Sequence, residues 1–126
     1  MGDLIYLTIE DVLYLHDEQL HLYGGAPGVR DQGLILSALL RPQTGYYADL
    51  IEEAAALWES LAMNHGFIDG NKRVAFESTL ILLQMNGLAL MPTQEVVIAF
   101  IYSHLEAGTF DKNMLDEWLR ANTAPL

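Results

Sequence analysis

The stretch NHGFIDGNKRVAF, from Asn64 to Phe76, separates two long apolar segments of the chain. It contains Lys72 and Arg73, two of the six lysines and arginines in the sequence. The pattern that follows predicts a helix beginning near Asn71, so both cations would lie in its first turn, where the helix dipole disfavours positive charge. An anion bound there would resolve the conflict, because free backbone N–H groups, the dipole and both cations would point at it.

The segments on either side of this stretch predict two long helices. The preceding helix begins near Asp49 and places its apolar residues on one stripe, which would carry His65 on the inward face at its last turn. The following segment is apolar nearly all round over residues 74–85, and Gly87 supplies a stop signal. A helix that is hydrophobic on every side belongs at the centre of a domain, so we expect the second helix to be buried.

Four further apolar patterns with capping or breaking residues predict the remaining helices. They cover residues 8–23, 34–42, 94–108 and 112–120. The second of them is expected to end at Pro42, because the residue before a proline is disfavoured in a helix. The glycine-rich segment 24–33 predicts a structured loop.

The ends of the chain add little regular structure in this interpretation. Residues 88–91 predict a short strand, which would pair with residues 4–7, and residues 122–126 resemble a tail. We therefore expect an all-α fold that forms a single domain over residues 1–126. Six helices would pack around a buried central helix, with at most one short β-pair.

Composition restricts the class of protein. The formal net charge of −11 argues against direct nucleic-acid binding, which requires lysine and arginine spread over a surface. There are no cysteines, and the first residues lack the basic segment of a secretory signal. No apolar run approaches the length that spans a bilayer. We expect a soluble cytoplasmic protein without membrane contact.

The natural anion for the helix start near Asn71 is a nucleotide phosphate. Gly70 would let the backbone come close to it. Asp69 is placed to hold Mg²⁺, which usually takes one or two carboxylates together with phosphate oxygens and water. His65 precedes the loop and is a candidate general base for an incoming hydroxyl.

Each of these residues also has an ordinary structural interpretation. A histidine at a helix end is commonly a cap, and an aspartate before Gly-Asn is a common turn or N-cap residue. Lys72 and Arg73 would then pair with acidic side chains at Glu52, Glu53 or Glu77. Six chemically distinct polar and glycine positions within the nine residues 65–73 favour the functional interpretation.

The segment HGFIDGNKR, residues 65–73, resembles the signature of the Fic/Doc superfamily and is most similar to its Doc (death-on-curing) toxin branch. Residues 15–43 and 108–120 are similar to that branch as well, so the resemblance covers nearly the whole chain. It implies a compact Fic-like fold. It also implies the following roles: His65 as the base that deprotonates the target hydroxyl, Asp69 as the acid near Mg²⁺, and Gly70, Asn71, Lys72 and Arg73 as the phosphate-binding loop and helix start.

Departures from the Fic pattern bear on the reaction. Fic members that transfer AMP carry a second glycine where this chain has Lys72, and a final arginine where it has Phe76. The resemblance therefore implies transfer of the γ-phosphate of ATP, as in Doc-type toxins, to a threonine of elongation factor Tu, which arrests translation. It further implies a type II toxin–antitoxin pair with a Phd-like antitoxin. AMP transfer and a catalytically silent antitoxin-binding module remain the alternatives.

Other positions are assigned more weakly. Arg30, in the glycine-rich segment, is a candidate extra phosphate or substrate contact, although local capping or pairing of Arg30 and Asp31 is at least as well supported. Gly66 replaces a proline common in the family, which we expect to loosen the loop. The remaining histidines are expected in surface or capping roles. A metal-dependent phosphohydrolase built on His16 and Asp17 would need further ligands that the sequence does not offer.

Overall fold

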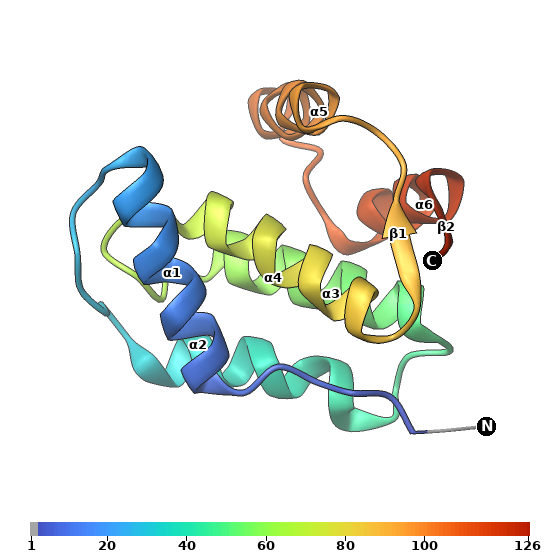
Figure 1. Cartoon of the computed structure of the whole chain (residues 1–126), viewed down its shortest axis with the longest axis horizontal. Coiled ribbons are helices and arrows are strands. Elements are labelled where there is room, and N and C mark those ends of the chain that lie inside the picture. Colours follow the sequence, from blue (N-terminus) through green and yellow to red (C-terminus); the bar gives the residue numbers. More distant parts are fainter. Residues whose placement is uncertain (1–2) are drawn as a thin grey trace.

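The computed structural model describes residues 3–126, and most of these residues are helical (Figure 1). In chain order the elements are α1 (Ile9–Tyr23), α2 (Gln32–Leu40), the 3-10 helix η1 (Arg41–Thr44), α3 (Leu50–Met63), α4 (Asn71–Met85), β1 (Leu88–Leu90), α5 (Gln94–Ala107), α6 (Lys112–Asn122) and β2 (Thr123–Pro125). The fold is all-α with one short β-pair in the described residues, which confirms the predicted class. Over the same range, none of the helices combines the length and the apolar character needed to cross a membrane.

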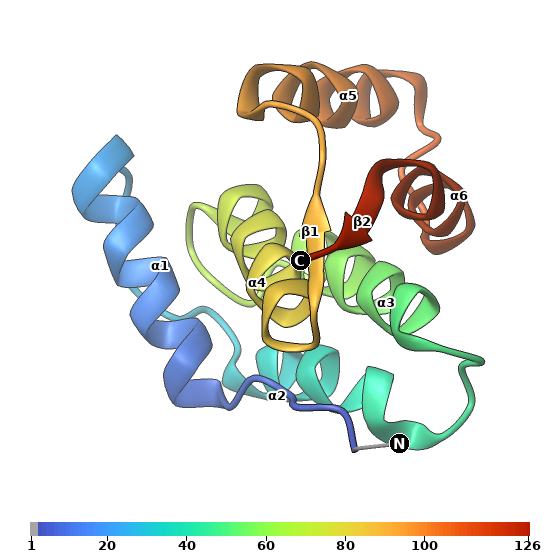
Figure 2. The ribbon, with the colours of Figure 1, turned by 45° about the vertical axis from the view of Figure 1, so that its right-hand side comes forward.

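Helices α3 and α4 lie side by side at the centre of the molecule (Figures 1 and 2). Helix α1 packs against α4, while α2 and α6 pack against α3. The predicted buried central helix is present, but α3 fills that place more fully than α4, with ten buried residues against seven. Helix α4 keeps a partly open side, on which Glu77 is half-buried and Gln84 is exposed. Its first turn is accessible as well, since Lys72 and Arg73 are exposed.

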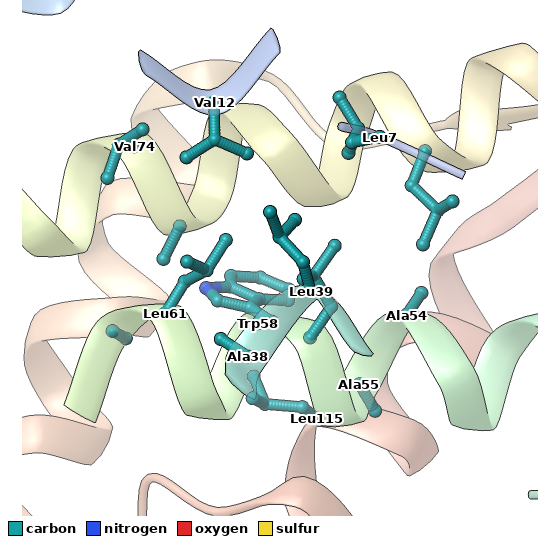
Figure 3. Close-up of a cluster of buried hydrophobic side chains, with 14 of the residues drawn as sticks. Leu7, Val12, Ala38, Leu39, Ala54, Ala55, Trp58, Leu61, Val74 and Leu115 are labelled. Carbon is teal, nitrogen blue, oxygen red and sulfur yellow. The ribbon is translucent and has the colours of Figure 1, made fainter. Parts of the chain in front are cut away.

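The core lies between α3 and α4, whose apolar side chains point toward one another (Figure 3). Trp58 on α3 is 1% exposed and is among its largest members. Its ring centroid lies 5.7 Å from that of Phe76, 6.1 Å from that of Phe110 and 5.9 Å from that of Trp118. Phe100 of α5 completes the group at 6.2 Å. Aromatic packing around one indole thus joins α3, α4, α5 and α6.

The strand predicted near residues 88–91 forms as β1, but the predicted partner is wrong. β1 pairs antiparallel with β2, with Ala89 opposite Ala124. Residues 4–7 form no strand. The prediction of a free tail over residues 122–126 is wrong for the same reason: α6 ends beside β1, so the residues that follow it complete the β-pair (Figure 2).

The structure also differs from the sequence prediction near the first residues, whereas it agrees at the end of α2. The N–H of Ile5 donates to Oδ1 of Asn86, whose Nδ2 donates back to the carbonyl oxygen of Ile5, so side-chain bonds replace the expected strand pairing. The α-helix α2 ends at Leu40, with Arg41 as its C-cap directly before Pro42, as the sequence predicts. The chain then continues as the 3-10 helix η1, with Pro42 in the first turn, where a proline is tolerated.

Candidate active site

Five of the six α-helices in residues 3–126 begin with a side-chain cap, and α4 does not. The capping residues, each accepting a hydrogen bond from a first-turn N–H group, are Thr8, Asp31, Asp49, Thr93 and Asp111. At α4 the cap position is Gly70, which has a left-handed φ of 77° and no side chain to accept a bond. The positive end of α4 is therefore left open to an acceptor from outside the helix.

The turn before α4 is held by the buried side chain of Asn71. Its Oδ1 accepts a hydrogen bond from the N–H of Phe67, and its Nδ2 donates to the carbonyl oxygen of Phe67, both at 3.0 Å. The first bond into the helix runs from the N–H of Val74 to the carbonyl oxygen of Gly70. Within residues 3–126 no acceptor meets the N–H groups of residues 71–73. These groups form the kind of anion site that the sequence predicts.

A cleft of about 480 Å³ opens over this helix start. Its lining includes all six residues predicted for catalysis or phosphate binding: His65, Asp69, Gly70, Asn71, Lys72 and Arg73. Tyr23, Gly24 and Gly25 from the end of α1, Ile68 from the loop and Tyr102 from α5 complete it. Arg30 does not line the cleft. The fold thus brings the predicted residues together, while their roles remain predictions.

His65 occupies a different place from the one predicted. Helix α3 ends at Met63, and His65 is exposed with a left-handed φ of 54°. The predicted position on the inward face of α3 is therefore wrong, because the helix stops before the histidine and the chain turns into the loop. Arg30 holds this strained turn: Nε donates to the carbonyl oxygen of His65 at 2.6 Å, and Nη2 to that of Asn64 at 3.2 Å. These bonds favour the local capping interpretation of Arg30.

Gly66 packs tightly, in contrast to the looseness expected from the missing proline. It is buried, and its carbonyl oxygen accepts hydrogen bonds from the N–H groups of Arg30 and Asp31 at 2.8 and 2.9 Å. A Cβ at this position would lie 2.5 Å from Cγ1 of Ile35 on α2. The glycine is therefore required for close packing of the motif loop against α2.

The carboxylate of Asp69 is held by two backbone groups. The N–H of Ala26 donates to Oδ2 at 3.0 Å, and the N–H of Gly70 donates to Oδ1 at 2.8 Å. These bonds, that of Ala26 first, lower the pKa of Asp69 below its ordinary value, and the charge of Arg73 adds to the effect. Each oxygen keeps further lone pairs, so the ionised carboxylate fits one ligand position of Mg²⁺. No group of three or more potential ligands occurs in residues 3–126, so phosphate oxygens and water would supply the others.

The two cations at the start of α4 are exposed and form no ion pair within residues 3–126. Two of the acidic residues predicted as their partners are occupied elsewhere: Glu52 pairs with Lys112, and Glu53 accepts a hydrogen bond from Tyr6. The guanidinium carbon of Arg73 lies 5.0 Å from the ring centroid of Tyr23. This contact orients Arg73 without neutralising it, so Lys72 and Arg73 both keep their charge for a ligand.

His16 is a residue of this region that the sequence prediction missed. The surface or capping role expected for it is wrong, because it faces inward from α1 and is 5% exposed. Its Nε2 lies 2.8 Å from the carbonyl oxygen of Asp69. The sequence carried a signal, since His16 is four residues after Val12 and three before Gln19, and all three share the buried face of α1. Because Nε2 of His16 already makes this hydrogen bond, the structure gives no support to a metal site at His16 and Asp17.

Comparison with known proteins identifies similar sequences over most of the chain. Residues 6–83 match the family model described as the Fic/DOC family. The Toxin Doc of Mycolicibacterium smegmatis is 42% identical over an alignment of 90 residues that covers 68% of this chain and 67% of the relative. The Protein kinase doc of Escherichia phage P1 is 33% identical over an alignment of 95 residues that covers 72% of this chain and 75% of the relative. The residues matched by the family model include the motif loop and the first turn of α4.

Proposed function

Because the chain belongs to the Fic/DOC family, we propose that it is a toxin enzyme that transfers the γ-phosphate of ATP to a protein hydroxyl group. One observation carries the proposal: α4 is the α-helix of residues 3–126 that lacks a side-chain cap, and its first turn carries two unpaired cations. Such a site stabilises negative charge, which is most of what catalysis of phosphoryl transfer requires.

Phosphate binding follows from the geometry of the first turn. The N–H groups of residues 71–73 point out of the helix end and are free to donate to phosphate oxygens. Lys72 and Arg73 add two positive charges at the same place. Gly70 has no side chain between these groups and the cleft, so a phosphate can approach the backbone closely. Mg²⁺ bound at Asp69 would neutralise part of the remaining phosphate charge.

His65 is the proposed general base. It lines the same cleft as the phosphate-binding groups and is exposed, so a protein hydroxyl can reach it. In the proposed step the hydroxyl oxygen attacks the γ-phosphorus of ATP while its proton passes to His65. A new oxygen–phosphorus bond forms, the bond from the γ-phosphorus to the β-phosphate oxygen breaks, and ADP leaves. Arg30 supports this role by holding the backbone of His65.

Two positions favour phosphate transfer over AMP transfer. Lys72 lines the cleft where AMP-transferring Fic members have a glycine. Phe76 stands where those members have an arginine, and its ring packs against Trp58 with the centroids 5.7 Å apart. The residue at that place is therefore packed against the aromatic core and has no charged group with which to bind a distal phosphate. AMP transfer to the same hydroxyl is the second candidate.

The proposed target and partner rest on the resemblance to Doc-type toxins. We propose a threonine of elongation factor Tu as the acceptor and a Phd-like antitoxin, in a type II pair, as the inhibitor. A second cavity of about 350 Å³ adjoins the cleft between α1, α4 and α5, with Phe76, Ile98 and Leu105 among its walls. Because Lys72 and Arg73 line both cavities, an antitoxin segment seated in the second would cover the phosphate site.

Labelled ATP distinguishes the candidate reactions. Elongation factor Tu is incubated with the chain, Mg²⁺ and ATP labelled at the γ- or the α-phosphate. The proposal expects label from the γ-position only, whereas AMP transfer would deliver label from the α-position only. His65→Ala should reduce transfer by about 10²–10⁴-fold, and His21→Ala, at an exposed position of α1, should not. A His65→Ala chain that remained fully toxic would support the silent-module alternative instead.

A further inference from the structure

His16 lies directly beneath the loop that carries the candidate active site. Its ring stacks on that of Phe67, with centroids 3.8 Å apart and planes inclined by 13°. Its Nε2 lies 2.8 Å from the carbonyl oxygen of Asp69. A carbonyl oxygen can only accept a hydrogen bond, so Nε2 carries the proton and donates it. One buried side chain thus contacts the motif loop at both of these residues.

This bond fixes the orientation of the peptide between Asp69 and Gly70. In a trans peptide the C=O and N–H groups point in opposite directions. With the carbonyl of Asp69 directed inward to His16, the N–H of Gly70 is directed outward, where it donates to Oδ1 of Asp69 at 2.8 Å. The carboxylate is also held from the other side by Ala26. The hydrogen bond from His16 and the two hydrogen bonds to the Asp69 carboxylate therefore all depend on the same orientation of this peptide.

The same peptide sets the start of α4. Gly70 follows it with a left-handed φ of 77°, and its carbonyl oxygen accepts the first hydrogen bond of the helix, from the N–H of Val74. If the peptide between Asp69 and Gly70 rotated, both the carboxylate and the first-turn N–H groups would change direction. An apolar side chain of similar size would fill the space under the loop but would leave the Asp69 carbonyl without its donor.

We propose that His16 is a positioning residue of the active site, which holds the peptide between Asp69 and Gly70 through its Nε2–H bond and stacks on Phe67. It touches neither ATP nor the acceptor hydroxyl. It acts by fixing the carboxylate and the open end of α4 in the orientation that binds phosphate. An effect of His16 on the rate of phosphate transfer rests on the proposed function, whereas the hydrogen bond from His16 to Asp69 does not.

Two substitutions separate the donor from the ring. His16→Phe keeps an aromatic ring under Phe67 and removes the donor, whereas His16→Gln removes the ring and keeps an N–H group at a similar reach. His16→Phe should lower kcat for phosphate transfer by about 100-fold, because small displacements at a reacting centre have effects of this size. His16→Gln should recover at least about tenfold of that loss. His21→Phe, at an exposed position on the same helix, is the matched control and should leave kcat unchanged.

Folding is monitored in parallel for each variant. Circular dichroism and thermal unfolding should show a folded His16→Phe chain, so that its loss of kcat is not a loss of folded protein. A His16→Phe chain that transfers phosphate at the parent rate overturns the proposal. A His16→Gln chain as impaired as His16→Phe also overturns it, because the donor would then not be the decisive group.

Nuclear magnetic resonance of the unaltered protein tests the bond without any variant or any activity. The proposal requires a proton on Nε2 of His16 that also exchanges slowly with solvent, because the ring is buried and this N–H is hydrogen-bonded. An unprotonated Nε2 overturns it, even if every His16 variant fails to fold. If the unaltered chain transfers no phosphate, the proposed function fails, and this proton signal still decides the role of His16 in the loop.

Discussion

Gly70 is the residue at which the motif loop becomes helix α4, and its left-handed φ of 77° sets the direction of the first turn. We predict that Gly70→Ala lowers the free energy of unfolding by about 1 kcal/mol, the cost of a Cβ in this conformation, and also reduces phosphate transfer. Gly108→Ala is the control, since Gly108 closes α5 with a φ of 69° in open space. It should cost similar stability, measured by urea unfolding, and leave transfer unchanged. Normal transfer by Gly70→Ala would contradict the proposed anion site.

Tyr6 is half-buried and supplies the hydrogen-bond donor for a buried carboxylate. Its hydroxyl donates to Glu53, which is 8% exposed on α3. Burial and then this bond raise the pKa of Tyr6 to about 12. Tyr6→Phe should lower the free energy of unfolding by roughly 1–3 kcal/mol, because Glu53 loses its donor in a buried place. Tyr14→Phe removes a comparable bond to an exposed glutamate and should change the unfolding midpoint little.

At the scale of elements, α3 is fixed at both ends by arginines from other parts of the chain. Arg30 donates to the backbone just beyond its C-terminus, at Asn64 and His65. Arg120 on α6 binds the N-cap residue Asp49, with Nη1 2.8 Å from Oδ2 and Nη2 2.9 Å from Oδ1. The central helix is therefore tied to the glycine-rich loop at one end and to α6 at the other.

The pair between α6 and α3 gives a pH-dependent prediction. The hydrogen bonds from Arg120 lower the pKa of Asp49, so the pair stabilises the folded state above the unfolded-state pKa of Asp49 and loses this effect as the pH falls through the folded-state value. Arg120→Met should reduce the free energy of unfolding at pH 7 by less than about 1 kcal/mol, since the pair is half-exposed. Urea unfolding should show that the two chains differ less once Asp49 is protonated. A difference that grew in acid would contradict this account.

At the scale of the whole molecule, the last residues close the fold. β1 connects α4 to α5, and β2 follows α6, so their pairing joins the end of α4 to the C-terminal part of the chain. The N–H of Leu126 adds a bond to the carbonyl oxygen of Gly87. This pairing lies away from the cleft, because none of its residues lines the site. The pairing of β1 and β2 therefore affects the site only through the stability of the helices that carry the site residues.

Removal of residues 123–126 tests this closure. The truncated chain should lose free energy of unfolding on the order of 1–3 kcal/mol, because the ladder bonds of β1 are left without partners. The matched control is Leu126→Ala, which alters an exposed side chain and keeps the backbone pairing. Thermal unfolding should place this control close to the parent. If the truncated chain were equally stable, residues 122–126 would be the tail that the sequence suggests.

Much of the molecule follows from local sequence patterns. Apolar periodicity and capping residues such as Thr8, Asp49 and Thr93 define where helices begin, because each helix must satisfy its own first N–H groups. The conflict between Lys72, Arg73 and the helix dipole indicated an anion site for the same local reason. All these signals lie within a few residues of the feature that they specify.

What the sequence by itself determined is the helical class, the starts of all the α-helices except α2, which begins at Gln32 inside the predicted loop, and the six predicted site residues that line one cleft. Only the tertiary structure decided that α3 is the more enclosed helix, that β1 pairs with β2, and that His16 lies under Asp69. The physical reason is distance along the chain. Helix starts depend on neighbouring residues, whereas burial, strand pairing and loop support depend on contacts between segments that meet only when the chain packs.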